Sequence, residues 1–154
     1  MKNIFLIFIT IFTVTACDHG QKINLYDYVG EFADAKSMEK VSLIITPIND
    51  ENINGLSIQN FDENIKMMCK DVKTQDTVKY AYKEEYPAII LDCMAESLSA
   101  PDQGFFYLYA SLLKFDDGLL IFLLTDDKNN FDKDYCYANP GCQIYKNAYN
   151  KIEK

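Results

Sequence analysis

Alternating apolar and polar positions dominate the chain from about residue 28 onward. Apolar side chains recur at every second position in five short segments. These segments are 28–32, 41–46, 56–59, 65–69 and 78–82. A period of two predicts β-strands that bury one face and expose the other.

Three later segments, 87–93, 105–113 and 119–125, are almost continuously apolar. Asp117-Gly118 separates the last two, and Asp-Gly between apolar runs predicts a β-hairpin. We expect 105–113 and 119–125 to be paired strands at the centre of the sheet. Their continuous apolar pattern predicts burial on both faces.

The C-terminal segment has another spacing. Ile144, Ala148 and Ile152 recur at intervals of four residues, as on one face of a helix. We therefore expect a short C-terminal helix that packs on the sheet. Together these patterns predict a mainly β (α+β) fold: an antiparallel sheet, small barrel or half-barrel of about seven or eight strands.

The first sixteen residues are an exception to the alternating pattern. Lys2 precedes the apolar segment Ile4–Val14, which as a helix would reach about 16 Å, half of a hydrocarbon core of about 30 Å. A basic start and a short apolar stretch are typical of an export signal. The ending Val14-Thr15-Ala16-Cys17 resembles the lipobox of bacterial lipoproteins, a family in which this cysteine is acylated and becomes the first residue.

This resemblance implies three parts: a signal peptide at 1–16, a lipidated tether at 17–25 and a single β-rich domain at 26–154. It also implies a lipid on Cys17 that attaches the chain to a membrane of the bacterial cell envelope, facing the periplasm. Asp18 resembles an inner-membrane retention signal. An ordinary cleaved signal with a cysteine nearby is the alternative. The segment 26–55 loosely resembles small lipoproteins with lipocalin-like half-barrels.

Charge limits the choice of partner. The net charge is −8, and every one of the fifteen basic residues is lysine. Nucleic-acid binders use clustered positive charge and favour arginine, so we exclude nucleic acid as a partner. An acidic surface suits a basic protein partner, or serves only solubility.

Four cysteines remain besides Cys17. In an exported chain an even number indicates two disulfides, for which three pairings exist. We favour Cys69–Cys93 and Cys136–Cys142, because Asn-Pro-Gly between the second pair predicts a tight turn. A zinc site is the rival interpretation, but the spacing is unsuitable and the single histidine, His19, lies on the tether.

Motifs for chemistry are weak in this chain. Asp50–Gly55 matches the first half of an EF-hand loop, but Phe61 stands where the closing carboxylate belongs, so we interpret it as a turn. Ser37 and Lys40 have the Ser-x-x-Lys spacing of penicillin-binding enzymes without that family's other motifs. We expect no enzymatic activity, no metal and no cofactor.

Candidate partner-binding residues are therefore exposed tyrosines and acidic loops. Tyrosine supplies contact area at low entropic cost, and carboxylates attract a basic surface. The candidates are Tyr82, Glu84, Glu85, Tyr86, Asp116, Asp117, Asp126, Asp127, Asp132 and Asp134.

These features predict an anchored binding protein of the envelope. Its most specific form is an immunity or inhibitor lipoprotein that neutralises a basic toxin or cell-wall hydrolase. A lipocalin-like carrier of a small hydrophobic ligand is one alternative. An assembly or structural lipoprotein of an envelope complex is another.

Overall fold

The computed structural model describes residues 25–37, 40–48, 55–70, 75–79, 85–115 and 118–153. Cys17, the signal segment 1–16 and most of the tether lie outside these residues. So do Tyr82, Glu84, Asp116 and Asp117.

Nine antiparallel strands make up most of the described chain, and short helical segments lie between them. The strands are β1 (Gly30–Asp34), β2 (Val41–Pro47), β3 (Leu56–Asn60), β4 (Ile65–Lys70), β5 (Gln75–Lys79), β6 (Glu85–Ser97), β7 (Phe106–Lys114), β8 (Leu119–Thr125) and β9 (Tyr145–Lys151). The helices are the 3-10 segments η1 (Leu25–Tyr28), η2 (Pro101–Gln103) and η3 (Lys128–Phe131), with one α-helix, α1 (Lys133–Ala138).

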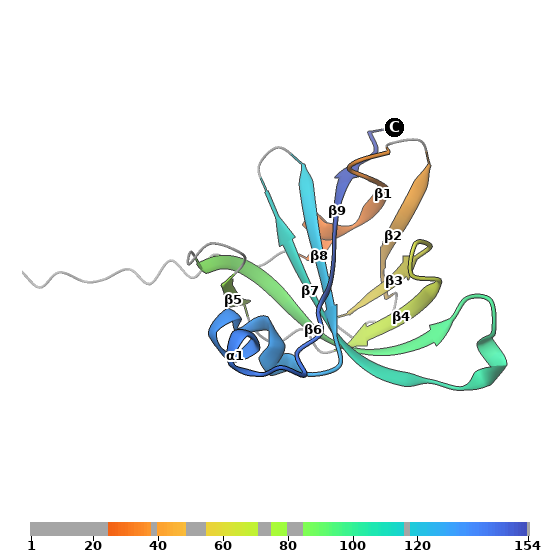
Figure 1. Cartoon of the computed structure of the whole chain (residues 1–154). Helices are drawn as coiled ribbons and strands as arrows, with labels where there is room; N and C mark the ends of the chain where they lie inside the picture. Colours follow the sequence, from red (N-terminus) through yellow and green to blue (C-terminus); the bar gives the residue numbers. More distant parts are fainter. Residues whose placement is uncertain are drawn as a thin grey trace, which may run out of the picture.

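Eight of these strands close into a β-barrel (Figure 1). Their order is β4-β3-β2-β1-β9-β8-β7-β6, and β6 returns to pair with β4. The long strand β6 makes this closure possible. The second half of β6 pairs with β4. Its first half pairs with β5, which is the one strand of the nine that is not part of the closed barrel. The prediction of a small antiparallel barrel is confirmed.

Alternation along the strands fills the barrel interior. In β3 and β4, every second residue is fully or almost fully buried, and the residues between them are more exposed. Large side chains such as Leu43, Ile58, Leu112 and Phe122 meet there with no exposed surface. The period of two read from the sequence thus reflects an inside and an outside.

The outer face of β7 and β8 is covered by the segment 126–144. Phe131 of η3 is buried against Leu113, Ile121 and Leu123, which all point outward. The Thr125 hydroxyl fixes this segment, because it donates to the Gln143 carbonyl and accepts from the Asn130 side chain, both at 2.9 Å. Burial on both faces is therefore confirmed for β8 and the second half of β7.

Both predicted disulfides are present. Cys69–Cys93 joins directly opposed residues of β4 and β6, with 4.1 Å between the Cα atoms, so it lies at the seam where the barrel closes. Cys136–Cys142 closes the loop after α1. Gly55 is needed near the first bridge, because a Cβ there would collide with the Cys69 carbonyl oxygen.

Three details of the prediction are wrong. The short helix lies at Lys133–Ala138, whereas the segment around Ile144 and Ala148 forms strand β9. The segment predicted as a strand from Tyr28 is partly the 3-10 helix η1, and β1 begins at Gly30. The first residues of 105–113 are exposed rather than buried.

Candidate interaction surface

Two of the acidic candidates have a structural role. Asp127 begins η3, and its carboxylate accepts from the Asn129 backbone N–H at 2.9 Å. Asp132 begins α1, and its carboxylate accepts from the backbone N–H groups of Asp134 and Tyr135 at 2.8 and 3.2 Å. These bonds satisfy N–H groups that have no partner inside a helix. Helix capping is therefore sufficient to explain the presence of Asp127 and Asp132, and no binding protein has to be invoked for them.

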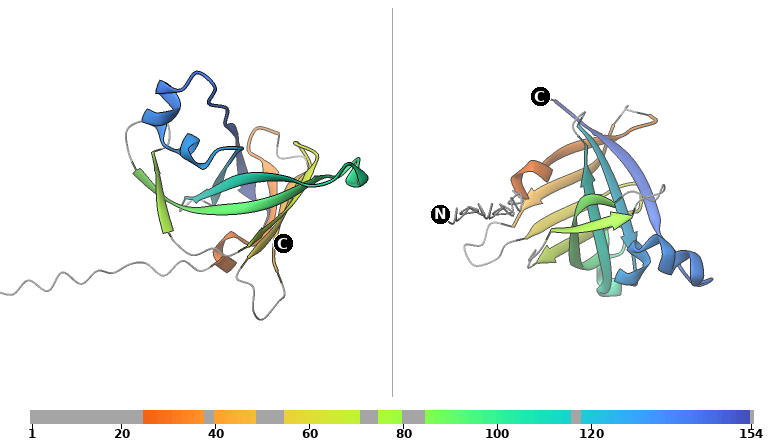
Figure 2. Two further views of the ribbon diagram at one scale, coloured as in Figure 1. Left: turned by 90° about the horizontal axis from the view of Figure 1, so that it is seen from below. Right: turned by 90° about the vertical axis from the view of Figure 1, so that its left-hand side faces the viewer.

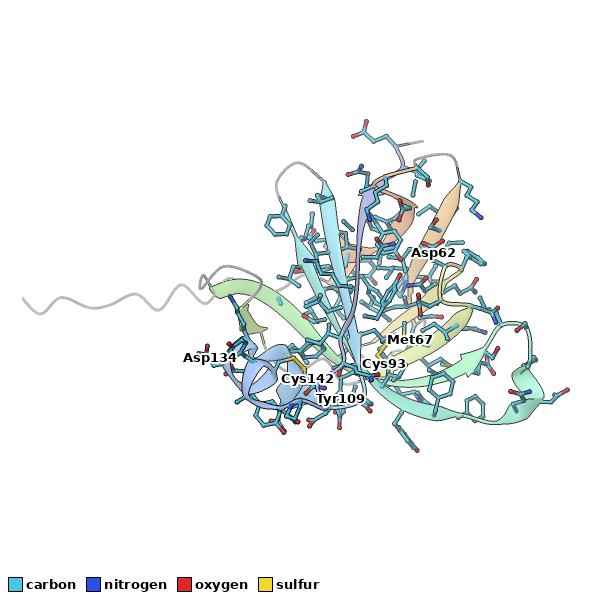
Figure 3. The ribbon with its side chains drawn as sticks, in the orientation of Figure 1. Asp62, Met67, Cys93, Tyr109, Asp134 and Cys142 are labelled. Carbon is cyan, nitrogen blue, oxygen red and sulfur yellow. A yellow bond between two sulfur atoms is a disulfide. The ribbon has the colours of Figure 1, made fainter. Side chains whose placement is uncertain are left out.

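The other acidic candidates that the structure describes lie on the segment 126–144 and at the start of β6. Asp126 and Asp134 are exposed on the segment 126–144. Figure 3 shows Asp134 on α1, far from Asp62 of the β3–β4 turn, which was not among the predicted candidates. Glu85 and Tyr86 begin β6, where they pair with Lys79 and Val78 of β5. Of the described candidates, Asp126, Asp127, Asp132 and Asp134 therefore share the segment 126–144, and Glu85 and Tyr86 lie apart from them in sequence at the start of β6.

The strongest candidate surface was missed in the sequence. Phe105 and Tyr107 expose 63% and 79% of their surface, and Phe106 between them exposes 42%. Phe105 directly precedes β7, and Phe106 and Tyr107 are its first two residues, next to the β6–β7 connection that extends past the body of the barrel (Figures 1 and 2). Consecutive exposed aromatics are unusual on a soluble surface and mark interaction sites.

Tyr107 belongs to a wider row of apolar side chains. Met68 on β4 pairs with Met94 on β6, which pairs with Tyr107 on β7. Directly paired residues share one face of a sheet, so these three side chains form a row on the outside of the barrel. Met68 is 38% exposed. We refer to Met68, Met94, Phe105, Phe106 and Tyr107 as the hairpin patch.

The β3–β4 turn holds the hairpin in place. Asn64 has a φ of 55°, and its side-chain amide bonds to the hydroxyls of Ser97 and Ser99 at 3.3 and 2.5 Å. Its backbone carbonyl accepts from the Leu98 N–H at 2.9 Å. These bonds fix the β6 side of the hairpin, and the aromatic residues lie on the β7 side. The patch is therefore presented on a supported ribbon.

Charged residues of both signs lie on the elements that carry the hairpin patch. Asp62 and Glu63 are exposed on the supporting turn, Asp102 is exposed in η2, and Asp92 is exposed on β6. Glu96 forms an ion pair with Lys66, at 3.9 Å between Oε1 and Nζ. Lys66 and Lys70 lie two residues to either side of Met68 and pair with Glu96 and Asp92, so the charge directly beside the patch is mixed, while Asp62, Glu63 and Asp102 add negative charge at the β3–β4 turn and in η2.

Another exposed tyrosine, Tyr137, lies in the last turn of α1. Tyr137 exposes 93% of its surface inside the loop that Cys136–Cys142 closes. Tyr135, two residues earlier in α1, is 41% exposed, and the other exposed residues nearby in sequence are short or polar, such as Ala138 and Pro140. These two tyrosines have no counterpart of the Met68–Met94–Tyr107 row beside them, so this segment is a weaker candidate than the hairpin patch.

The tyrosines of β9 have a structural role at one end of the interior. The hydroxyl of Tyr149, a fully buried residue, contacts Asn60 Nδ2 at 3.2 Å, Tyr145 Oη at 3.3 Å and Asp62 Oδ2 at 3.4 Å. Burial raises the pKa of Tyr149 and, to a smaller extent, that of Tyr145. The side-chain oxygen of Asn60, Oδ1, accepts from the backbone N–H groups of Asp62 and Glu63. These two bonds connect the network to the β3–β4 turn.

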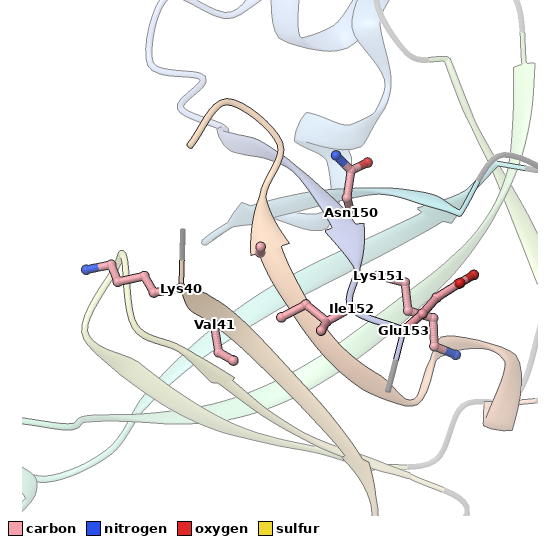
Figure 4. Close-up of a pocket in the computed structure, with 7 residues that line it drawn as sticks. Lys40, Val41, Asn150, Lys151, Ile152 and Glu153 are labelled. Carbon is pink, nitrogen blue, oxygen red and sulfur yellow. The ribbon is translucent and has the colours of Figure 1, made fainter. Parts of the chain in front are cut away.

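An open groove of about 600 Å³ is lined by residues of β1, β2 and β9 and of the segments that adjoin β2 and β9. Its floor is apolar, with Ala33, Val41 and Ile152, and its rim carries lysines. The side chains of Lys40 and Lys151 point away from each other (Figure 4), so they do not converge on one anion. The groove therefore lacks the convergent polar groups that define a ligand site.

Metal binding finds no support among the described residues, where no three His, Cys, Asp or Glu side chains are grouped to hold an ion. None of the helices in the described part of the chain combines the length and apolarity needed to span a bilayer.

The fold and its surface define a closed, disulfide-bonded antiparallel β-barrel with a projecting aromatic hairpin. Comparison of this chain with protein-family models, with curated proteins and with solved structures finds no significant match.

Proposed function

We propose that the chain is a lipid-anchored binding protein of the bacterial envelope that captures a basic protein through the hairpin patch. The most specific candidates are a toxin or a cell-wall hydrolase, which the protein would neutralise as an immunity or inhibitor lipoprotein. The observation that carries the proposal is the run of exposed aromatics at Phe105–Tyr107.

The packing of the barrel favours an external binding site over an internal one. A carrier of hydrophobic ligands needs space among its inward side chains, whereas here residues such as Leu43, Met67 and Phe122 meet inside with no exposed surface. The exposed apolar area lies instead outside the barrel, on the hairpin. We therefore prefer capture of a protein to transport of a small ligand.

Charge supports a basic partner. The chain has a net charge of −8, and Asp62, Glu63 and Asp102 are exposed at the β3–β4 turn and in η2. Complementary charge accelerates encounter and disfavours acidic proteins. The lipobox-like Val14–Cys17 would hold the domain at the membrane, where secreted toxins and hydrolases act.

Anchoring is tested by intact-mass analysis of the full chain expressed in a Gram-negative host. We expect acylated Cys17 at the N-terminus of the mature protein, and a Cys17→Ser variant that is released from the membrane. An unmodified full-length polypeptide with free thiols would rule out the anchor.

Capture is tested with the anchored chain in detergent micelles and a panel of cationic peptidoglycan hydrolases, with acidic hydrolases of similar size as controls. We expect binding to at least one cationic enzyme, with an association rate that falls about tenfold between low and physiological salt. Failure to bind any cationic enzyme at low salt, or equal binding to the acidic controls, would refute the proposal.

A further inference from the structure

We infer that the start of β7 binds the N-terminal residues of an extended peptide as an added strand, with the first residue of that peptide opposite Tyr107. The inference rests on the proposed function in taking the hairpin patch as the binding surface, and it specifies which part of a partner is bound. The features recognised are a free N-terminal ammonium group and an apolar first side chain.

The edge of β7 that faces away from β6 is paired along only part of its length. β7 pairs with β6 over residues 106–112 and with β8 over residues 109–114. Within the described part of the chain, no strand lies opposite residues 106–108 on the β8 side. An open strand edge presents backbone N–H and C=O groups to which another extended chain can bond.

The register shows which backbone groups point to this open edge. The Phe115 N–H donates to the Leu119 carbonyl at 2.9 Å, so these two residues are a hydrogen-bonded pair of the β7–β8 ladder. Such pairs recur at every second residue of an antiparallel ladder, and the register continues unbroken to Tyr109 and Thr125. The N–H and C=O of Tyr107, two residues earlier, therefore point to the open edge, and those of its two neighbours point toward β6.

The chain after β8 leaves the position that would close the edge. If β8 continued in register past Thr125, Asp127 would lie opposite Tyr107. Instead the chain bends at Asp126, the Asp127 N–H lies 3.4 Å from the Thr125 hydroxyl oxygen, and the Asp127 carboxylate caps η3. The position opposite Tyr107 is thus left for a chain that begins there and runs toward the β6–β7 connection, in the same direction as β8.

Charge decides which end of a peptide this position accepts. The end of the added strand nearest β8 lies next to Asp126, which is exposed, with Asp127 following it. In a strand antiparallel to β7 this end is the N-terminus, and its ammonium group would donate to the Tyr107 carbonyl oxygen beside these carboxylates. A parallel strand would place a C-terminal carboxylate there, which the same carboxylates repel.

The first side chain of the peptide would extend an existing apolar row. Met68, Met94 and Tyr107 are paired in one row across β4, β6 and β7 on the outside of the barrel. A residue opposite Tyr107 lies on the same face and continues this row. Met68 and Tyr107 are 38% and 79% exposed, so an apolar side chain at that position buries apolar surface that now faces water.

A second copy of the chain fits this edge less well than a peptide terminus. If two β7 strands paired antiparallel about Tyr107, residue 105 of one copy would fall opposite Tyr109 of the other. Thr125 already occupies that position. A peptide that begins opposite Tyr107 avoids the collision because nothing precedes its first residue.

The test uses the full chain in detergent micelles and the synthetic hexapeptide Ile-Thr-Val-Thr-Gly-Lys, amidated at its C-terminus and labelled with a fluorophore on its lysine. Fluorescence anisotropy should show saturable binding with a Kd of about 100 μM. Acetylation of the N-terminus should weaken binding about tenfold, and serine in place of the first isoleucine about fivefold. Asp126→Asn should weaken binding of the free-amine peptide about fivefold and leave binding of the acetylated peptide unchanged.

Two substitutions separate the backbone of Tyr107 from its side chain. Tyr107→Ala removes only the side chain and should weaken binding about fivefold. Tyr107→Pro also removes the N–H on the open edge, where proline is tolerated in a strand, and should weaken binding about 30-fold or more. Tyr137→Ala, at an exposed tyrosine outside the hairpin, should change affinity less than about twofold. Circular dichroism checks that Tyr107→Pro is folded, and if it is not, acetylation and Asp126→Asn decide the result.

The absence of saturable binding at protein concentrations up to about 1 mM would overturn the inference. Equal binding of the free and acetylated peptides, or equal losses for Tyr107→Ala and folded Tyr107→Pro, would do the same. A dimer in sedimentation that Tyr107→Pro dissociates would mean that a second copy occupies the edge. If a cationic hydrolase binds but the peptide does not, the inference is wrong and the proposed function stands. If the peptide binds as expected but no cationic hydrolase does, the proposed function is wrong and the peptide site stands.

Discussion

The two halves of strand β7 have similar apolar sequences and opposite environments. Ala110, Leu112 and Leu113 in the second half are buried, whereas Phe106 and Tyr107 at its start are exposed. The difference comes from the neighbours. The second half has the packed interior on one side and Phe131 with the segment 126–144 on the other. The first half extends past this cover. The same strand therefore contributes to stability at one end and is available for binding at the other.

The largest effect should follow from truncation in the buried half. Leu112→Ala removes a fully buried side chain from the barrel interior and should lower the free energy of unfolding by about 2–5 kcal/mol. Chemical denaturation followed by circular dichroism measures this value. The matched variant in the exposed half is Tyr107→Ala. Similar losses for both variants would contradict the division of the strand.

The two disulfides allow a second comparison. Replacing Cys69 and Cys93 with alanine opens a loop with a sequence separation of 24, and should cost about 3.5 kcal/mol on the loop-entropy model. Replacing Cys136 and Cys142, with a separation of 6, should cost about 2.4 kcal/mol. Denaturant midpoints of the two double variants give the order. A larger loss of unfolding free energy on removal of Cys136–Cys142 than of Cys69–Cys93 would show that closing the barrel seam is not what stabilises the fold.

Alkaline pH should destabilise the barrel through Tyr149. Burial raises the pKa of Tyr149 above its ordinary value of 10.0, so the unfolded chain releases this proton at a lower pH than the folded one. The stabilising contribution is complete below about pH 10 and is lost as the pH rises above it. Tyr149→Phe should therefore show a shallower loss of stability above pH 10 than the wild type.

Tyr137→Phe is the control for this titration, because Tyr137 is almost fully exposed. Unfolding free energies measured on both sides of pH 10 should change with pH as steeply in Tyr137→Phe as in the wild type. Tyr28 and Tyr145 have raised pKa values from burial as well, so Tyr149→Phe should reduce the alkaline loss without abolishing it. Identical pH profiles for Tyr149→Phe and the wild type would contradict this explanation.

The acidic caps should have a smaller effect. Asp132→Ala removes two hydrogen bonds at the start of α1 and should lower the unfolding free energy by about 1 kcal/mol. Asp126→Ala, an exposed acidic residue on the same segment, should change it by less than about 0.5 kcal/mol. Equal losses for the two variants would mean that capping does not explain Asp132.

The strands of the barrel were predictable because burial alternates with the side-chain direction. Leu56, Ile58 and Asn60 point inward, while Ser57 and Gln59 point outward, and the sequence has this period of two. The disulfides were predictable because their number and the turn at Asn139–Gly141 leave few pairings. Cys69 and Cys93 are indeed opposed across β4 and β6.

Strand β9 was mistaken for a helix because both of its faces contact apolar residues. Tyr145 and Tyr149 belong to the interior cluster, while Ile144 and Ala148 contact the outer cluster. Each pair has a spacing of four residues, which fits one face of a helix and equally two repeats of a strand. Periodicity alone does not separate these cases.

The hairpin patch was not predictable from the sequence, because exposure of β7 depends on how far the segment 126–144 extends over it. Phe105–Tyr107 and Ala110–Leu113 have the same continuous apolar pattern, and only the extent of the segment 126–144 distinguishes them. Similarly, the carboxylates of Asp127 and Asp132 accept hydrogen bonds from the first residues of η3 and α1. This capping role can be recognised only once the positions of the two helices are known.

The most direct test measures stability and affinity on the same variant, Tyr107→Ala. Tyr107 is exposed, so we expect the unfolding free energy to change by less than about 0.5 kcal/mol. We also expect affinity for a cationic peptidoglycan hydrolase to fall about 30-fold. A loss of more than 1 kcal/mol of stability with unchanged affinity would show that the start of β7 serves the fold and not a partner.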